Sequence, residues 1–265
     1  MMLPPLEGKL TQDNFFVYAA ADSVYFDTHG RALINSILQN TDVGVHLHIY
    51  NPTPDQIQLC QQPRVSASWE YIPDNAFDAP FSIWAQDNLP DLMLGRKRKM
   101  LGLKQYNEQG TNPEQLRRWI QKTYYACARF VRMAELLTKP TRFLEIYVDG
   151  VVRKPFDYHL SGRDFFLYEK VKGGHLAGSI LFTETKESLD FVKELGQLIR
   201  HEIEQDNIYW FLDQNTLDKI IPKYNRGLLP IDYIDWHMNV NSSIWSAKGK
   251  RKELEVFKRE QQKYL

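Results

Sequence analysis

Asp149 stands where a short apolar run of the sequence, 143–148, comes to an end. Gly150 and then a basic pair follow it, a pattern typical of a buried strand that stops at a polar edge. A carboxylate at the C-terminal end of a parallel strand faces the crevice in which α/β folds bind ligands. Carboxylate oxygens also bind Mg²⁺ and Mn²⁺. Asp149 is therefore a candidate cation ligand, and the alternative is that Asp149 and Gly150 only form a turn.

The segments that precede Asp149 alternate between strand and helix patterns. The sequence predicts strands over 14–21, 43–50 and 65–72, a polar turn over 22–27, a helix over 29–39 and a long helix over 114–137. Lys139 and Pro140 end the long helix, and the strand that leads to Asp149 follows at once. A strand, a helix and a second strand in this order form a βαβ unit.

The segments after Asp149 continue the same alternation. The sequence predicts a strand over 176–182, helices over 186–206 and 209–220, one or two short strands within 228–236 and a charged helical tail over about 250–265. We find no repeat or linker, so we expect one domain over 1–265. The fold class is α/β, with a mainly parallel central sheet flanked by helices.

The composition excludes several classes of protein. The chain has 33 basic and 33 acidic residues, a zero balance that does not favour a nucleic-acid partner. Its two cysteines, Cys60 and Cys127, lie far apart, which indicates structural thiols in a reducing compartment. No signal peptide or apolar run of transmembrane length is evident, so we expect a cytoplasmic protein without a transmembrane segment.

Several segments, in their order along the chain, resemble GT-A-fold glycosyltransferases of the glycogenin and bacterial lipopolysaccharide galactosyltransferase group. Thr123 to Phe130 is similar to a helix that bears Tyr and Arg, and it leads to a strand that resembles the one carrying the Asp-x-Asp metal motif. Tyr147 stands in place of the first carboxylate of that motif. Other similar segments are the first nucleotide-binding loop (Val17 to Asp22), an acceptor-side strand (Gly174 to Phe182) and an Asp-Gln-x-x-Leu segment (Asp213 to Leu217).

The resemblance implies a GT-A (Rossmann-like) domain with a site for a nucleoside-diphosphate sugar. Ala20 and Asp22 would contact the nucleotide, and Arg129 would organise the donor pocket. Tyr147 and Asp149 would lie at the diphosphate, with Asp149 as a ligand of Mn²⁺ or Mg²⁺. A polar turn before a helix is the alternative for Asp22, and a solvated helix charge is the alternative for Arg129.

The resemblance also gives roles to residues in the second half of the chain. Asp213 would be catalytic, either as the base that deprotonates an acceptor hydroxyl or as the group that orients the donor sugar; a helix N-cap is its alternative. The family ends in His-x-x-Gly-x-x-Lys, whose His binds the metal and whose Lys binds the diphosphate. We assign these roles to His237 and to Lys248 with Gly249, although Lys248 lies eleven positions after His237 and does not match the family spacing. A structural histidine and an exposed charged face are the alternatives.

These features support three functional hypotheses. The first is a glycosyltransferase that moves a sugar from a nucleotide donor to a hydroxyl of a glycan or other acceptor. The second is a degenerate module that binds a nucleotide or glycan without turnover, since Tyr147 cannot replace a carboxylate as a ligand of a hard cation at neutral pH. The third, a methyltransferase, lacks the glycine-rich loop that would follow the first strand. The sequence does not indicate the oligomeric state.

Overall fold

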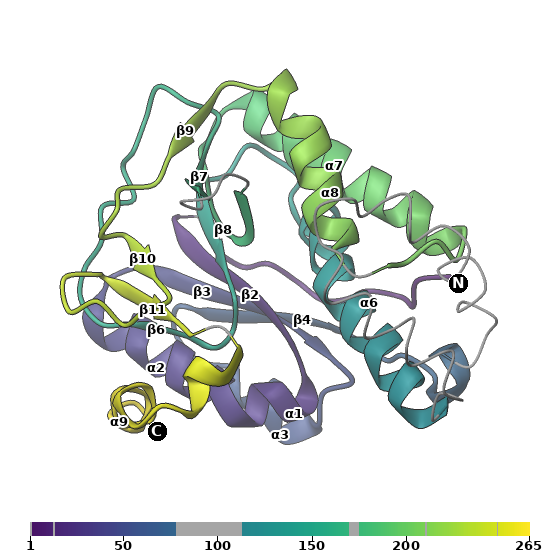
Figure 1. Ribbon diagram of the computed structural model, residues 1–265, viewed down its shortest axis with the longest axis horizontal. Helices are drawn as coiled ribbons and strands as arrows, with labels where there is room; N and C mark the ends of the chain where they lie inside the picture. Colours follow the sequence, from purple (N-terminus) through teal and green to yellow (C-terminus); the bar gives the residue numbers. More distant parts are fainter. Residues whose placement is uncertain (1, 13, 78–112, 170–174, 210, 248) are drawn as a thin grey trace.

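A central sheet with helices on both faces forms the body of the molecule (Figure 1). The computed structural model describes residues 2–12, 14–77, 113–169, 175–209, 211–247 and 249–265. Within these ranges, no helix combines the length and the apolar composition that crossing a bilayer requires.

The large sheet has eight strands in the order β1-β4-β3-β2-β5-β8-β7-β9. Their bounds are β1 Glu7–Gly8, β2 Phe16–Asp22, β3 Gly44–Tyr50, β4 Val65–Glu70, β5 Phe143–Ile146, β7 Phe165–Glu169, β8 His175–Phe182 and β9 Arg226–Leu228. Strands β4, β3, β2 and β5 run parallel to one another, whereas β8 is antiparallel to both β5 and β7. The predicted α/β class with a largely parallel central sheet is confirmed.

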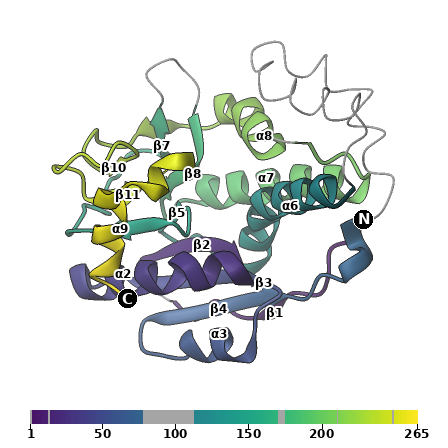
Figure 2. The same cartoon turned by 60° about the horizontal axis from the view of Figure 1, so that its bottom comes forward.

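Helices cover both faces of this sheet (Figure 2). Helices α6 (Pro113–Leu136), α7 (Lys186–Glu204) and α8 (Leu212–Ile220) pack on one face, and α2 (Arg31–Asn40) and α3 (Pro54–Leu59) pack on the other. The alternation of side chains along β2 serves both layers. Phe16 and Tyr18 join the core under α6 and α7, while Val17 and Ala19 join the core under α2.

The segment after β5 carries the chain into a second, smaller sheet. Strand β5 ends at Ile146, two residues earlier than the sequence pattern predicts, because the amide of Gly150 turns back to the carbonyl of Tyr147 (2.9 Å). The chain then enters β6 (Gly150–Val152), which pairs with β11 (Ile244–Ser246), itself paired with β10 (Ile234–Asp235). Asp149 therefore lies in the turn that joins the two sheets.

The predicted turn over 22–27 is wrong, because the chain there is helical. Helix α1 (Ser23–Tyr25) and the π-helical η1 (Phe26–Gly30) lead directly into α2. The Asp22 side chain accepts a hydrogen bond from the amide of Tyr25 (2.7 Å), which is an N-cap. Short 3-10 helices lie at η2 (Asp74–Phe77), η3 (Ile221–Lys223) and η4 (Gly249–Glu253).

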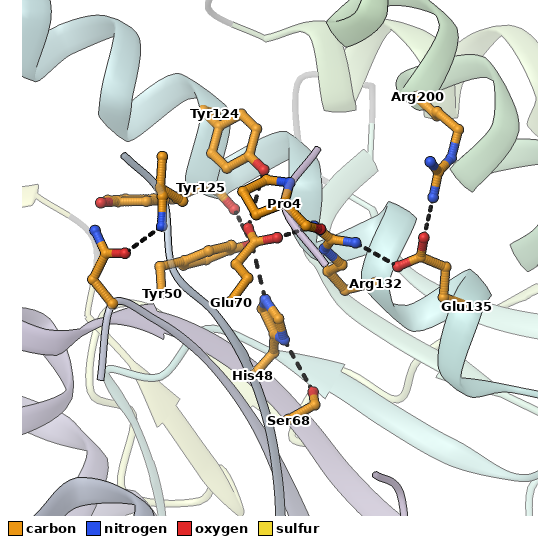
Figure 3. Close-up of polar contacts among 12 residues, drawn as sticks. Pro4, His48, Tyr50, Ser68, Glu70, Tyr124, Tyr125, Arg132, Glu135 and Arg200 are labelled. Carbon is orange, nitrogen blue, oxygen red and sulfur yellow. Dashed lines mark hydrogen bonds and ion pairs between the residues drawn. The ribbon is translucent and has the colours of Figure 1, made fainter. Parts of the chain in front are cut away.

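A buried polar cluster ties α6 to the sheet (Figure 3). Glu70, at the end of β4, has no exposed surface; it pairs with Arg132 of α6 and accepts a hydrogen bond from Tyr124 (3.0 Å). Arg132 also reaches Glu135 (2.7 Å). A buried guanidinium with two carboxylate partners keeps its charge compensated. These contacts fix the orientation of α6, whose next turn toward the N-terminus carries Arg129.

The chain ends on α9 (Glu255–Gln262), which lies beside α2 (Figures 1 and 2). Phe257 is fully buried in a small core with Ala32 of α2 and Trp245 of β11. The Asn35 side chain donates a hydrogen bond to the carbonyl of Tyr264 (2.7 Å). The C-terminal segment is thus packed against the first half of the chain.

Candidate functional site

A pocket of about 320 Å³ opens at the C-terminal ends of the parallel strands, between α6, α8 and η4. Two carboxylates, two cations and three aromatic rings are among the side chains around it. Its lining consists of Thr123, Ala126, Cys127, Arg129, Tyr147, Asp149, Phe211, Asp213, Gln214, Trp236, Ser246, Ala247, Gly249 and Lys252. The ends of parallel strands are where α/β folds bind ligands.

A larger hollow of about 630 Å³ lies at the opposite edge of the sheet. Phe15 and Arg142 line it, and they directly precede β2 and β5. It therefore lies at the N-terminal ends of the parallel strands, on the side away from Asp149. We take the smaller pocket as the candidate functional site. It lies at the strand ends where α/β folds bind ligands, and charged side chains line it.

Asp149 forms a compact polar group with Tyr25 and Lys252. The carboxylate is only 4% exposed, accepts a hydrogen bond from the Tyr25 hydroxyl (2.8 Å) and forms an ion pair with the Lys252 ammonium. That ammonium also contacts the Tyr25 hydroxyl and lies 4.6 Å from the centre of its ring. Burial lowers the pKa of Lys252 to about 8, so the amine still carries its proton at neutral pH.

Arg129 lies between two carboxylates on the other side of the pocket. Its Nε is 3.1 Å from Oε1 of Glu145, and its Nη2 is 3.1 Å from Oδ2 of Asp213. Glu145 of β5 has no exposed surface; burial raises its pKa, and the neighbouring Arg129 guanidinium opposes that shift and favours the ionised carboxylate. Arg129 therefore fixes the start of α8 relative to β5.

Tyr147 fills the space between Arg129 and β8. The ring centre lies 5.1 Å from the Arg129 guanidinium carbon, and a Cβ added to Gly178 would overlap the ring. Burial raises the pKa of the Tyr147 phenol, so it stays protonated and neutral. The side chain that replaces the first motif carboxylate is therefore a packed neutral ring.

Solved structures of glycosyltransferases share this arrangement of elements. Over 94% of this chain, GlyE of Streptococcus pneumoniae TIGR4 aligns with a TM-score of 0.55 at 12% identity, and the galactosyltransferase LgtC aligns with 0.53 at 10% identity. The bifunctional enzyme WbbM aligns over 94% of this chain with 0.52 at 16% identity. The aligned regions cover 96% of the LgtC chain but only 60% of GlyE and 47% of WbbM.

The chain has a GT-A glycosyltransferase-like fold. No family model matches the sequence. A search of curated proteins likewise finds no match. The assignment of the fold therefore depends on structural similarity alone. At identities of 10–16%, that similarity shows the fold and not the reaction or its substrates.

Some of the predicted site residues line the pocket, and others do not. Arg129, Tyr147, Asp149, Asp213 and Gly249 all line it.

The other predicted residues lie elsewhere. Ala20 and Asp22 lie at the end of β2 and are not among the lining residues; Asp22 acts through the cap that positions Tyr25. His237 is exposed, its backbone amide bonds to Asp235 (2.7 Å), and it does not line the pocket. Lys248 lies outside the described residues.

The sequence analysis did not identify three residues of the site: Lys252, which lines the pocket, and Tyr25 and Glu145, which contact the lining residues Asp149 and Arg129. Lys252 carried a readable signal, because Ser246, Gly249 and Lys252 have the spacing of the family ending His-x-x-Gly-x-x-Lys. In this register a serine replaces the histidine. Tyr25 and Glu145 carried no comparable signal, since a tyrosine in a predicted turn and an acidic residue in an apolar run have no pattern to identify them.

The donor set of the pocket does not fit a divalent cation. The Asp149 carboxylate is ion-paired with Lys252, Tyr147 is a neutral phenol and position 246 is a serine. Throughout the part of the chain that the structure describes, no group of three His, Cys, Asp or Glu side chains is arranged to hold a metal ion. Mg²⁺ and Mn²⁺ require anionic or strongly polar oxygen ligands, and an ammonium at the carboxylate competes with them.

Proposed function

We propose that this protein transfers a sugar from a nucleoside-diphosphate sugar to a hydroxyl group of an acceptor. The observation that carries the proposal is the convergence of Arg129, Asp149, Asp213 and Lys252 on one pocket at the ends of the parallel strands. The GT-A-like fold supports it, and LgtC, which shares that fold, was solved in complex with donor and acceptor sugar analogs.

The reaction breaks the bond between the anomeric carbon of the sugar and an oxygen of the diphosphate. The bonding electrons leave with the diphosphate oxygen, the acceptor oxygen bonds to the anomeric carbon, and the acceptor proton passes to a base. Negative charge therefore grows on the diphosphate in the transition state. A cation fixed beside that oxygen stabilises the growing charge without reorganisation, and Lys252 is suited to this role.

Asp213 is suited to positioning the donor sugar. Its Oδ1 accepts a hydrogen bond from the amide of Gln214 (2.8 Å), and its Oδ2 pairs with Arg129. Both carboxylate oxygens are therefore already engaged by donors of the protein, which fix the orientation of the side chain at the pocket. We therefore assign to Asp213 hydrogen bonds to sugar hydroxyls rather than abstraction of the acceptor proton.

The acceptor side of the pocket offers an aromatic platform. Trp236 lines the pocket and stacks with Tyr168, their ring centres 5.4 Å apart. The flat apolar face of an aromatic ring suits the C–H face of a sugar. A glycan acceptor fits this surface.

A panel of nucleoside-diphosphate sugars tests the proposal. We expect release of nucleoside diphosphate from at least one donor, and we expect the Asp213→Asn variant to release it about 100-fold more slowly, because a carboxylate that positions the sugar is lost. Asp55→Asn is the matched control, since Asp55 is exposed on α3 and does not line the pocket; its rate should stay within about twofold of the wild-type rate. Absence of both donor binding and release across the panel would refute the proposal.

The replacement of the first motif carboxylate by Tyr147 favours a second candidate, a module that binds a nucleotide sugar without turnover. The same panel separates the two. Calorimetric binding of a donor, with no release above the rate without protein in the presence of varied acceptors, would establish the binding module.

A further inference from the structure

Lys252 occupies the position at Asp149 in which the sequence predicted a divalent cation. Its ammonium pairs with the carboxylate and contacts Tyr25, whose hydroxyl donates to the same carboxylate oxygen. The ammonium thus lies against a buried carboxylate and an aromatic ring, two groups that stabilise a cation. The Lys252 side chain is still 27% exposed, and it lines the pocket.

The backbone around Lys252 holds this ammonium in place. Lys252 lies on η4, and α9 follows η4 directly. Phe257 of α9 is fully buried, and the side chain of Gln261 contacts the ring of His29 (2.9 Å), which packs edge-on against Tyr25 (4.6 Å between ring centres). The two partners of the ammonium, Asp149 and Tyr25, are themselves held by β5 and α1.

The backbone near Lys252 is open at Gly249. Gly249 lines the pocket with φ +62°, and no atom lies within 4 Å of the position that a Cβ would occupy. A side chain at this position would be strained and would project into that space. An oxygen anion can therefore approach the backbone there, within the same short helix that carries Lys252.

We propose that the pocket binds the diphosphate of its donor without a divalent cation, and that the Lys252 ammonium, held by Asp149 and Tyr25, supplies the charge that a metal ion would supply. This inference rests on the proposed function. It agrees with the absence of a metal ligand at two positions of the resembled motifs. With Tyr147 neutral and a serine at position 246, a fixed ammonium needs only the one remaining carboxylate as its counter-charge.

Calorimetry with uridine, guanosine, adenosine and cytidine diphosphates tests the proposal on the full chain. We expect at least one of them to bind with the same affinity, within about twofold, in excess EDTA and in Mn²⁺. In EDTA the Lys252→Met variant should bind about tenfold or more weakly, because a buried charge-assisted contact is lost. Lys258→Met, which removes one exposed positive charge from α9, is the matched control and should bind like the wild type.

Lys252→Met leaves the buried Asp149 carboxylate without its ammonium and could unfold the protein. The double variant Lys252→Met/Asp149→Asn removes both charges, and the same loss of affinity is expected of it, with the fold checked by circular dichroism. Binding that requires Mn²⁺ and is reversed by EDTA would overturn this inference and leave the proposed function standing. Metal-free binding that survives both variants would overturn the role of Lys252, and no binding under any condition would overturn both proposals.

Discussion

Arg129 is the shared counter-charge of two carboxylates, Glu145 and Asp213. Replacing it by Met leaves Glu145 and Asp213 buried without their shared counter-charge. Breaking a buried ion pair in this way costs about 3–5 kcal/mol. We expect the Arg129→Met variant to lose that much free energy of unfolding in a urea titration.

The control for this prediction is Arg118→Met, because Arg118 lies exposed on the same helix. Its effect should stay within about 0.5 kcal/mol. Equal stabilities of the two variants would show that Glu145 and Asp213 do not depend on Arg129.

At the residue scale the sequence indicated part of the pocket. Arg129, Asp149 and Asp213 were singled out, and the structure brings them to one cavity. Lys252 could have been found from its spacing to Gly249 alone. Glu145 could not have been found in this way. An acidic residue can be recognised as buried only when its partner is known, and the partner of Glu145, Arg129, lies on another element.

The pairing of β5 with β8 positions the Tyr147 ring against β8. Ile146 of β5 is paired with Ser179 of β8, so the next residue, Tyr147, comes to lie over Gly178. Gly178→Ala would force the ring to move, and overpacking of this kind costs about 1–3 kcal/mol. We expect that loss of stability in thermal or urea unfolding, together with weaker donor binding.

A double-mutant cycle isolates this contact. The Tyr147→Ala variant removes the ring, so adding Gly178→Ala to it should cost at least about 1 kcal/mol less than adding it to the wild type. Additive effects of the two changes would mean that the ring does not depend on the glycine.

The sequence predicted helices and strands best where the hydrophobic pattern was long and periodic. The helix α6 and the strands β2, β3 and β4 follow their predicted ranges closely, because each has an apolar stripe or alternation set by its own core face. Residues 22–27, which include helix α1 and the start of η1, were predicted as a polar turn. Their helical form depends on the Asp22 cap and on contacts with residues distant in the chain, from Tyr25 to Asp149 and from His29 to Gln261.

Docking of the C-terminal helix is a property of the whole molecule. Phe257 of α9 has no exposed surface and anchors the segment that carries Lys252. Phe257→Ala should cost about 3–5 kcal/mol of unfolding free energy through the cavity it leaves. It should also weaken diphosphate binding about tenfold, because η4 loses its support.

Val256→Ala is the control, since Val256 is 48% exposed on the same helix. It should change stability by about 0.5 kcal/mol or less and leave binding intact. Unchanged binding in a folded Phe257→Ala variant would show that η4 holds its position without α9.

The overall architecture was predictable from the order of the segments, since alternating strands and helices imply a parallel sheet covered on both faces. The small sheet of β6, β10 and β11 was not predictable in the same way. Its strands have two or three residues each, too few to show a pattern, and β6 lies about ninety positions before its partner β11.

The group formed by Tyr25, Asp149 and Lys252 can be completed only late in the synthesis of the chain. Tyr25 and Lys252 are separated by 227 positions. Helix α1, which carries Tyr25, and the turn that carries Asp149 are both made long before η4 leaves the ribosome. Because contacts between distant segments form late in folding, a nascent chain carries the first two members of the group without the third. The pocket is thus complete only after η4 and α9 have been made. If the proposed function holds, chains that have not yet folded through α9 do not bind the donor.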